Sequence, residues 1–169
     1  MKKIVVIFGS SRNNGNTMEA VRAVLGRRKA KLINLGKSDI SPFDYMHKNS
    51  DDSFLKIVDE LINFNILVFA TPVYWYAMSA QLKIFFDRLS DLITIRKDLG
   101  RKLKGKICYL IASGTDPKLP KGFEVPFART CNYFDMYYKK SFYYYVKKNK
   151  PMSKKAKQTA KRFGKLIKK

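Results

Sequence analysis

Five short apolar runs, each bounded by polar or turn-forming residues, constrain the fold of this chain more than any other feature. They lie at Ile4–Phe8, Lys31–Leu35, Ile66–Ala70, Ile107–Ala112 and Ser141–Val146. Their hydrophobicity is continuous rather than alternating, which is typical of strands buried on both faces of a parallel sheet. The runs therefore predict five strands of one sheet with helices on both of its faces.

Between these runs, apolar residues recur at the spacing of three and four that places them on one face of a helix. The helical segments contain Met18, Val21, Val24 and Leu25, then Phe54, Ile57, Val58, Leu61 and Ile62, and then Leu82, Phe85, Phe86 and Leu89. Residues able to cap a helix precede them, namely Asn16 or Thr17, Asp51 or Asp52, and Ser79, with Ser153 further on. Residues 116–132 are predicted as a loop followed by a short helix. The alternation predicts a doubly wound α/β fold in a single domain over residues 1–169.

Composition limits the class of protein further. Of the 169 residues, 46% are hydrophobic, which is enough for a core and excludes disorder for most of the chain. No apolar stretch approaches the ~18 residues that a membrane helix needs. The N-terminal segment becomes polar after Phe8 and contains no small-residue cleavage site of a signal peptide. Cys108 and Cys131 are too few for a disulfide framework or a zinc cage. We therefore expect a cytoplasmic protein with no bound metal.

The segment G-S-S-R-N-N-G-N-T at residues 9–17 follows the first run and opens the first helix. Its small residues let backbone N–H groups converge, and Ser10, Ser11 and Thr17 add hydroxyl donors beside the positive end of the helix dipole. Arg12 can add a charge-assisted hydrogen bond. The segment lacks the lysine of a Walker A loop and the second glycine of G-x-G-x-x-G. It predicts a loop that binds a terminal phosphate, the alternative being an ordinary polar turn.

The segment T-P-V-Y-W-Y-A-M-S-A-Q-L-K at residues 71–83 follows the third run and contains three consecutive aromatic residues. Exposing aromatic side chains to water in a loop is energetically unfavourable unless they pack against a flat, apolar ligand or surface. Pro72 stiffens the turn, and Tyr74 and Trp75 are placed to flank a planar ring system. Alternatively, these aromatic residues pack in the core or contact the other subunit of a dimer. Ligands of open α/β sheets lie outside the carboxyl ends of the strands, so both loops belong to the region where a ligand is expected.

On these two segments the chain resembles the NAD(P)H-dependent FMN reductase and quinone reductase branch of the flavodoxin-like superfamily. Residues 9–17 are similar to its G-S-x-R-x-x-G-N-T loop, and residues 72–88 to its P-x-Y-W-x-x-M-x-x-x-L-K-x-F-x-D-R block. The resemblance implies a flavodoxin-like, five-stranded parallel sheet of order 2-1-3-4-5 with bound FMN. It also implies a homodimer with the flavin near the interface.

The same resemblance implies which residues hold the cofactor. The phosphate of FMN would contact Ser10, Arg12, Asn14, Gly15, Asn16 and Thr17, and the isoalloxazine would contact Pro72, Val73, Tyr74 and Trp75 on one side and Ser113, Gly114 and Thr115 on the other. NAD(P)H would deliver hydride to the flavin, and a small acceptor such as a quinone or free flavin would then take the electrons. No side chain needs to act as a base, although Tyr74 or Tyr76 could donate a proton to the acceptor.

An iron–sulfur branch of the same superfamily carries a compact cysteine motif before the second helix. Residues 40–52 keep the Asp51–Asp52 pair but contain no cysteine, which excludes a cluster. His47, the single histidine, lies in this segment and is expected to be a surface or packing residue. Cys108, in an apolar strand, and Cys131 are not expected to be nucleophiles.

The formal net charge of +22 is unevenly distributed, because all 13 acidic residues lie at or before Asp135. Ala156, Ala160, Phe163 and Ile167 mark one face of a last helix whose remaining positions are rich in lysine. A packed helix with a solvated basic face is the favoured interpretation. A binding module for nucleic acid or an anionic membrane is an alternative function, and so is a flavodoxin-like electron carrier. The charge argues against the carrier, since the resemblance leads us to expect carriers to be acidic.

Overall fold

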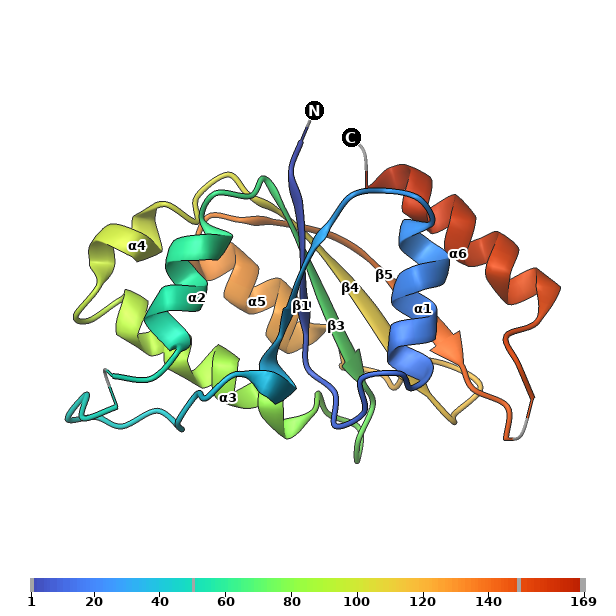
Figure 1. Ribbon diagram of the computed structural model, residues 1–169, viewed down its shortest axis with the longest axis horizontal. Helices are drawn as coiled ribbons and strands as arrows, with labels where there is room; N and C mark the ends of the chain where they lie inside the picture. Colours follow the sequence, from blue (N-terminus) through green and yellow to red (C-terminus); the bar gives the residue numbers. More distant parts are fainter. Residues whose placement is uncertain (1, 50, 149, 168–169) are drawn as a thin grey trace.

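The computed structural model describes residues 2–49, 51–148 and 150–167, and it contains one five-stranded sheet (Figure 1). The strands are β1 (Ile4–Phe8), β2 (Lys31–Asn34), β3 (Ile66–Pro72), β4 (Ile107–Gly114) and β5 (Tyr137–Tyr145). Their order is β2-β1-β3-β4-β5, and every neighbouring pair is parallel. The predicted doubly wound α/β architecture and the flavodoxin-like strand order are confirmed.

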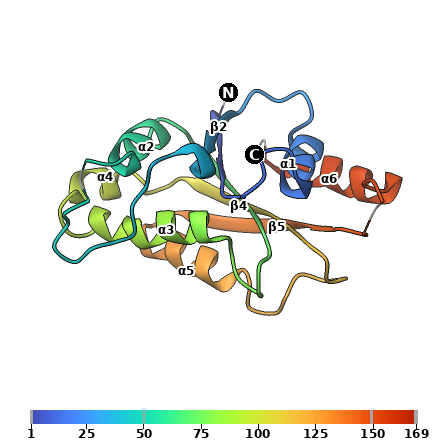
Figure 2. The same cartoon turned by 60° about the horizontal axis from the view of Figure 1, so that its bottom comes forward.

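Helices cover both faces of the sheet (Figure 1, Figure 2). They are α1 (Asn16–Leu25), α2 (Phe54–Leu61), α3 (Ala80–Arg88), α4 (Lys97–Arg101), α5 (Val125–Tyr133) and α6 (Lys154–Leu166), with 3₁₀ turns η1 (Leu35–Lys37) and η2 (Leu89–Leu92). Alternate residues of a strand point to opposite faces. Val6 of β1 therefore packs in the cluster that contains residues of α1 and α6, whereas Val5 and Ile7 pack in the cluster that contains residues of α2 to α5.

Several strand ends differ from the prediction. β3 and β4 continue beyond the predicted Ala70 and Ala112, so Pro72 and Gly114 are the last residues of strands rather than parts of loops. β5 begins at Tyr137 instead of Ser141, ends at Tyr145, and exposes Lys139 and Lys140. It is an edge strand, and its first half lacks the continuous apolar character that identifies a strand buried on both faces.

Other boundaries follow from competing hydrogen bonds. β2 ends at Asn34, one residue earlier than predicted, and the Asn34 side chain caps η1 by accepting from the Gly36 N–H at 3.1 Å. Gly15 rather than Asn16 or Thr17 precedes α1. Ser53 precedes α2, but the predicted Asp52 does accept from the N–H of Phe54, the first residue of that helix, at 2.8 Å.

Ser79 and Ser153 do cap α3 and α6, as predicted, by accepting from the N–H groups of Leu82 and Ala156. The short α4 was not predicted, whereas the loop and short helix within residues 116–132 are confirmed by α5. Over the described residues, none of the helices combines the length and the apolar character needed to cross a membrane.

Candidate functional site

A cleft of about 240 Å³ lies at the carboxyl edge of the sheet. It is lined by Ser10, Arg12, Gly15, Asn16, Thr17, Pro72, Val73, Tyr74, Ser113, Gly114, Thr115 and Val146. The structure therefore brings together three segments that follow or end β1, β3 and β4, with a fourth contribution just after β5. This is the position at which open α/β sheets bind ligands.

The loop after β1 starts at a tightly packed glycine. A Cβ added at Gly9 would lie 2.7 Å from the Leu82 Cβ and 3.0 Å from the Ser79 Oγ, so only glycine fits there without a shift. The Ser79 hydroxyl donates to the Gly9 carbonyl oxygen at 2.8 Å. These contacts hold the start of the loop against the first turn of α3.

The loop ends at the N-terminus of α1, which has no side-chain cap. Its preceding residue is Gly15, and the first backbone hydrogen bond of the helix runs from the Glu19 N–H to the Gly15 carbonyl at 3.1 Å. Within the described chain, the N–H groups of Asn16 and Thr17 have no acceptor, unlike the Ser-capped starts of α3 and α6. The helix start therefore presents free donors and the positive end of a dipole to the cleft.

Three buried hydroxyls lie beside these amides. Ser10, Thr17 and Ser113 are each no more than 5% exposed. The Thr17 Oγ1 and Ser113 Oγ atoms are 2.7 Å apart, which uses the hydrogen of one hydroxyl and leaves the other without an acceptor in the described residues. Arg12 supplies a positive charge, and none of the described residues that line the cleft carries a carboxylate. The arrangement suits an anion with several oxygen acceptors.

The end of β3 forms the opposite part of the cleft. The Val73 N–H donates to the Ser113 carbonyl at 2.7 Å, which joins this segment to β4. A tight turn follows, closed by two hydrogen bonds between Tyr74 and Ala77. Its central residues, Trp75 and Tyr76, have φ values of 47° and 65°, which favour glycine. Two bulky residues in this region indicate backbone strain beside the cleft.

The aromatic side chains of this turn face solvent. Trp75 is 93% exposed and Tyr76 is 69% exposed, whereas Tyr74 is half-buried and lines the cleft. Adjacent exposed aromatics are characteristic of a surface that contacts a ligand or a partner.

Gly114 keeps the β4 side of the cleft narrow. A Cβ at this position would lie 2.7 Å from the Tyr143 hydroxyl and 3.2 Å from the Val73 Cβ. The Tyr143 hydroxyl donates to the Asp116 carbonyl at 2.8 Å, and burial raises the pKa of Tyr143. This bond holds the loop after β4 against β5.

Two predicted site residues lie outside the lining of the cleft. The Asn14 side chain accepts a hydrogen bond from Arg22 at 3.3 Å, and Trp75 points into solvent. Conversely, Val146, predicted as the end of the last strand, follows β5 and lines the cleft. The signal was available, because the residue that follows a parallel strand lies at the carboxyl edge where ligands bind.

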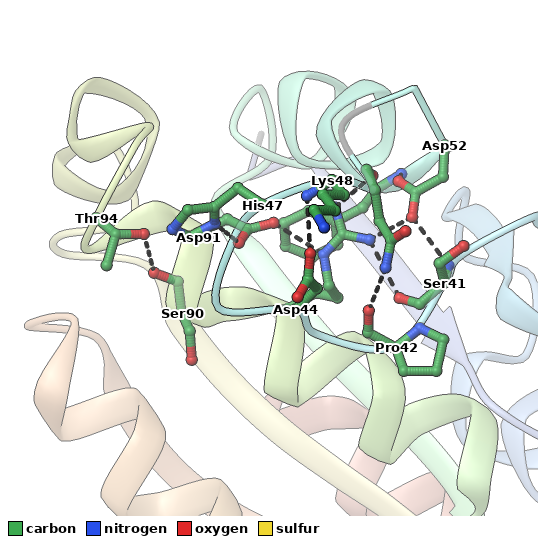
Figure 3. Close-up of polar contacts among 12 residues, drawn as sticks. Ser41, Pro42, Asp44, His47, Lys48, Asp52, Ser90, Asp91 and Thr94 are labelled. Carbon is green, nitrogen blue, oxygen red and sulfur yellow. Dashed lines mark hydrogen bonds and ion pairs between the residues drawn. The ribbon is translucent and has the colours of Figure 1, made fainter.

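The segment before α2 is held by a buried arginine, Arg88, whose partners Ser41, Asp52 and Asp91 are labelled in Figure 3. Arg88 is 2% exposed, pairs with Asp52, and donates to the Asp91 carboxylate at 2.8 Å. It also donates to the carbonyls of Ser41 and Asn49, both at 3.1 Å. Burial lowers the pKa of Arg88, but the two carboxylates outweigh this effect and raise it.

His47 takes part in the same network. Its Nδ1 lies 2.9 Å from the Asp91 Oδ1 (Figure 3). Its ring also contacts Phe43 edge-on. The prediction of a packing role for His47 agrees with these contacts. Cys108 and Cys131 are both buried, and the Cys131 thiol together with burial raises the pKa of Cys108.

Larger hollows exist elsewhere, including one of about 390 Å³ between α4 and the end of α5. Its lining includes Leu92, Ile93 and Tyr133 with three basic side chains. It lies away from the carboxyl edge of the sheet, and its lining includes the carboxylate of Asp135, whereas the lining of the cleft contains no acidic residue.

A parallel sheet of this order, with an uncapped helix start after the loop that follows β1 and an aromatic turn after β3, defines a flavodoxin-like protein. Residues 2–125 match the model of a family described as NADPH-dependent FMN reductase, and the chain belongs to this family. The predicted class of enzyme, an FMN-dependent NAD(P)H oxidoreductase, is confirmed at the level of the family.

Individual relatives support this assignment. The chain is 37% identical over 129 residues to the Bacillus subtilis protein YwqN, named "putative NAD(P)H-dependent FMN-containing oxidoreductase", with 71% of each chain covered. It is 29% identical over 131 residues to an NAD(P)H dehydrogenase (quinone) of Archaeoglobus fulgidus, covering 69% of this chain and 64% of that protein. The structure of Trp repressor binding protein from Bacillus subtilis matches 95% of this chain and 97% of its own, at 26% identity and a TM-score of 0.77.

Proposed function

We propose that the cleft at the carboxyl edge holds FMN, with the cofactor phosphate at the start of α1. The observation that carries this proposal is the uncapped helix start, whose free N–H groups lie beside three buried hydroxyls and Arg12. Ser10, Arg12, Gly15, Asn16 and Thr17 would bind the phosphate directly. Asn14 would act from outside the cleft lining, by holding the loop to Arg22.

The flavin ring would lie between the end of β3 and the loop after β4. Pro72, Val73 and Tyr74 would contact one side, and the backbone of Ser113, Gly114 and Thr115 the other. The close packing at Gly114 keeps side-chain atoms out of this space. Trp75 would flank the ring from the strained turn, where its exposed indole is free to cover a planar ligand.

Bound FMN supplies the redox chemistry, accepting hydride from NAD(P)H and passing electrons to a second substrate. The protein then needs no base and contributes binding, orientation and donors that stabilise negative charge on the ring. A quinone is the acceptor class we propose, because the relative from Archaeoglobus fulgidus is named for quinones and because exposed aromatics line the approach. Tyr74, which is half-buried at the cleft, is placed to donate a proton to such an acceptor.

We further propose that the whole chain forms this one FMN-binding domain, and that it acts as a cytoplasmic homodimer. Two buried free cysteines suit a reducing compartment, and the exposed Trp75 and Tyr76 offer a surface for a second copy. Light scattering of the purified protein tests the dimer, and a monomer at micromolar concentration would contradict it.

The visible spectrum of the purified protein tests FMN binding. We expect the absorption of an oxidised flavin, or its appearance after reconstitution with FMN, and bleaching when NADPH or NADH is added without oxygen. Reoxidation by a quinone would then complete the cycle. A protein that cannot be loaded with FMN would overturn the proposal, and a loaded protein that is not reduced by either nucleotide would indicate a carrier instead.

A matched pair of variants tests the phosphate site. Arg12→Ala should weaken FMN retention by about tenfold, since it removes a charge-assisted hydrogen bond. Arg27→Ala, which removes the same charge from an exposed position just beyond α1, should leave retention unchanged. Equal losses in both variants would show that net charge, not the cleft, holds the cofactor.

A further inference from the structure

The outward face of α6 carries basic side chains and no acidic ones. Its predicted apolar face is packed, since Ala160, Phe163 and the following Ile167 are buried in the cluster on that side of the sheet. No acidic residue follows Asp135 in the sequence, so the helix contains no compensating carboxylate. The exposed basic residues of α6 are Lys154, Lys155, Lys157, Lys161, Arg162 and Lys165.

Three of these lysines form a stripe along the helix. Lys154, Lys161 and Lys165 are spaced by seven and four residues, which places them on one side of α6. At 1.5 Å per residue, the stripe is about 16 Å long. Both ends of the helix are held, because Ser153 caps its first turn and the Tyr109 hydroxyl donates to a carbonyl of its last turn at 2.8 Å. The stripe is therefore a fixed array of positive charges.

α1 extends this basic surface, because it lies beside α6 on the same face of the sheet (Figure 1, Figure 2). Arg22 of α1 is exposed, and so are Arg27 and Lys29 just beyond its end. The single acidic residue of α1, Glu19, is partly buried and accepts from the Met152 N–H at 3.4 Å. These three residues and the six of α6 form one surface of like charge, the α1–α6 surface.

The charges of this surface do not stabilise the helix that carries them. Lys157, Lys161 and Lys165 follow one another at intervals of four residues, where like charges repel. Elsewhere exposed lysines pair with acids, as Lys83 does with Asp87 at 2.6 Å. Among the residues that the structure describes, the ion pairs involve no residue of α6. An anionic partner accounts for charges that helix stability does not.

The chemistry of the surface favours a nucleic-acid duplex over a membrane or a single strand. Helices that bind membranes combine basic residues with exposed aromatic or large apolar ones, and single strands stack their bases on aromatic side chains. Of the large hydrophobic residues that are exposed in the described chain, Leu166 alone belongs to α1 or α6. A duplex carries one charge per ~1.7 Å, so a length equal to the stripe presents about nine phosphates to lysine and arginine.

We propose that the α1–α6 surface binds the phosphate backbone of a nucleic-acid duplex. Contacts to phosphate carry no sequence information, so duplexes of different sequence bind with similar affinity. The lysines of the stripe do not line the cleft. Duplex binding is therefore a property separate from the proposed FMN chemistry and does not depend on it.

Fluorescence anisotropy with a DNA duplex of about 20 base pairs tests the surface, and we expect a Kd in the micromolar range at about 0.1 M salt. The triple variant Lys154→Gln, Lys161→Gln, Lys165→Gln should weaken binding about tenfold or more. It should also lower the slope of log K against log salt by about 2–3, since up to three phosphate contacts are lost. Glutamine is a good helix former, so the variant is expected to fold, which an unchanged circular dichroism spectrum checks.

A second triple variant, Lys56→Gln, Lys97→Gln, Lys102→Gln, is the matched control. It removes the same charge from exposed positions in α2, in α4 and just after α4, outside the α1–α6 surface. Its Kd should stay within about twofold of the wild type, because charges more than about 10 Å away are screened at 0.1 M salt.

Equal losses of affinity in the two triple variants would show attraction by net charge and overturn the proposal, as would the absence of duplex binding by the wild type. Tighter binding of a single strand of the same length would also overturn it. Binding to phosphatidylserine vesicles without binding to the duplex would assign the surface to a membrane instead. If the protein cannot be loaded with FMN, the proposed function fails, whereas duplex binding with the expected loss in the α6 variant still supports this surface.

Discussion

Thr17 and Ser113 are 96 positions apart in the sequence, yet their hydroxyl oxygens lie 2.7 Å apart in a buried contact. The contact joins the first turn of α1 to the end of β4, and so joins the phosphate side of the cleft to the ring side. It also leaves one hydroxyl hydrogen free for a ligand.

A double-mutant cycle with Thr17→Val and Ser113→Ala should measure this contact. We expect each single change to lower the free energy of unfolding by about 1–2 kcal/mol and the two to be coupled by about 1 kcal/mol. Denaturant titration monitored by circular dichroism measures the energies. Strict additivity of the two changes would contradict the direct hydrogen bond.

Replacing the buried Arg88 should be strongly destabilising. Arg88→Leu leaves the carboxylates of Asp52 and Asp91, which are 5% and 4% exposed, buried without their cation. We expect a loss of about 3–5 kcal/mol in the free energy of unfolding. Arg96→Ala, which breaks the exposed pair with Asp98, should cost less than about 1 kcal/mol. Similar losses in the two variants would argue against the buried network.

The turn at Trp75 and Tyr76 should be stabilised by glycine. Tyr76 has φ of 65° and is 69% exposed, so Tyr76→Gly relieves strain and removes few contacts. We expect a gain of about 0.5–1 kcal/mol, after the entropy cost of glycine, seen as a higher melting temperature. Tyr45→Gly is the control, since Tyr45 is exposed but has no positive φ, and it should bring no gain. A loss in Tyr76→Gly would show that the turn is not strained.

Stability should fall at alkaline pH through Cys108. The neighbouring Cys131 thiol and burial raise the pKa of Cys108 in the folded state, whereas a thiol in the unfolded chain ionises near ~8.5. The folded state then binds more protons, so the free energy of unfolding is unaffected well below that pH and falls as pH rises above it.

Chemical denaturation at several pH values measures this dependence. Above pH ~9 the decline in the wild type should exceed that in Cys108→Ala by about 1 kcal/mol per pH unit, because the variant lacks the titrating thiol. Parallel curves for the two proteins would show that Cys108 ionises equally in both states.

Sequence periodicity located the starts of β1, β2, β3 and β4 and failed at the start of β5. β1 matched its predicted bounds because both of its faces are apolar, whereas the first half of β5 is exposed and carries lysines. The capping predictions succeeded for Ser79 and Ser153, whose hydroxyl oxygens accept from the first turns of α3 and α6. The prediction failed at Thr17, whose hydroxyl bonds the distant Ser113, whereas Asp52 uses one carboxylate oxygen for the Phe54 N–H at the start of α2 and the other for Arg88.

The sequence by itself determined the α/β class, the order of elements and the two segments that carry the family motifs. These depend on local patterns, namely apolar periodicity, turn residues and the composition of single loops. The tertiary structure alone decided which hydroxyls are buried, that α1 starts without a cap, and that Val146 reaches the cleft. Such facts depend on contacts between residues far apart in the chain, whose partners no local pattern specifies.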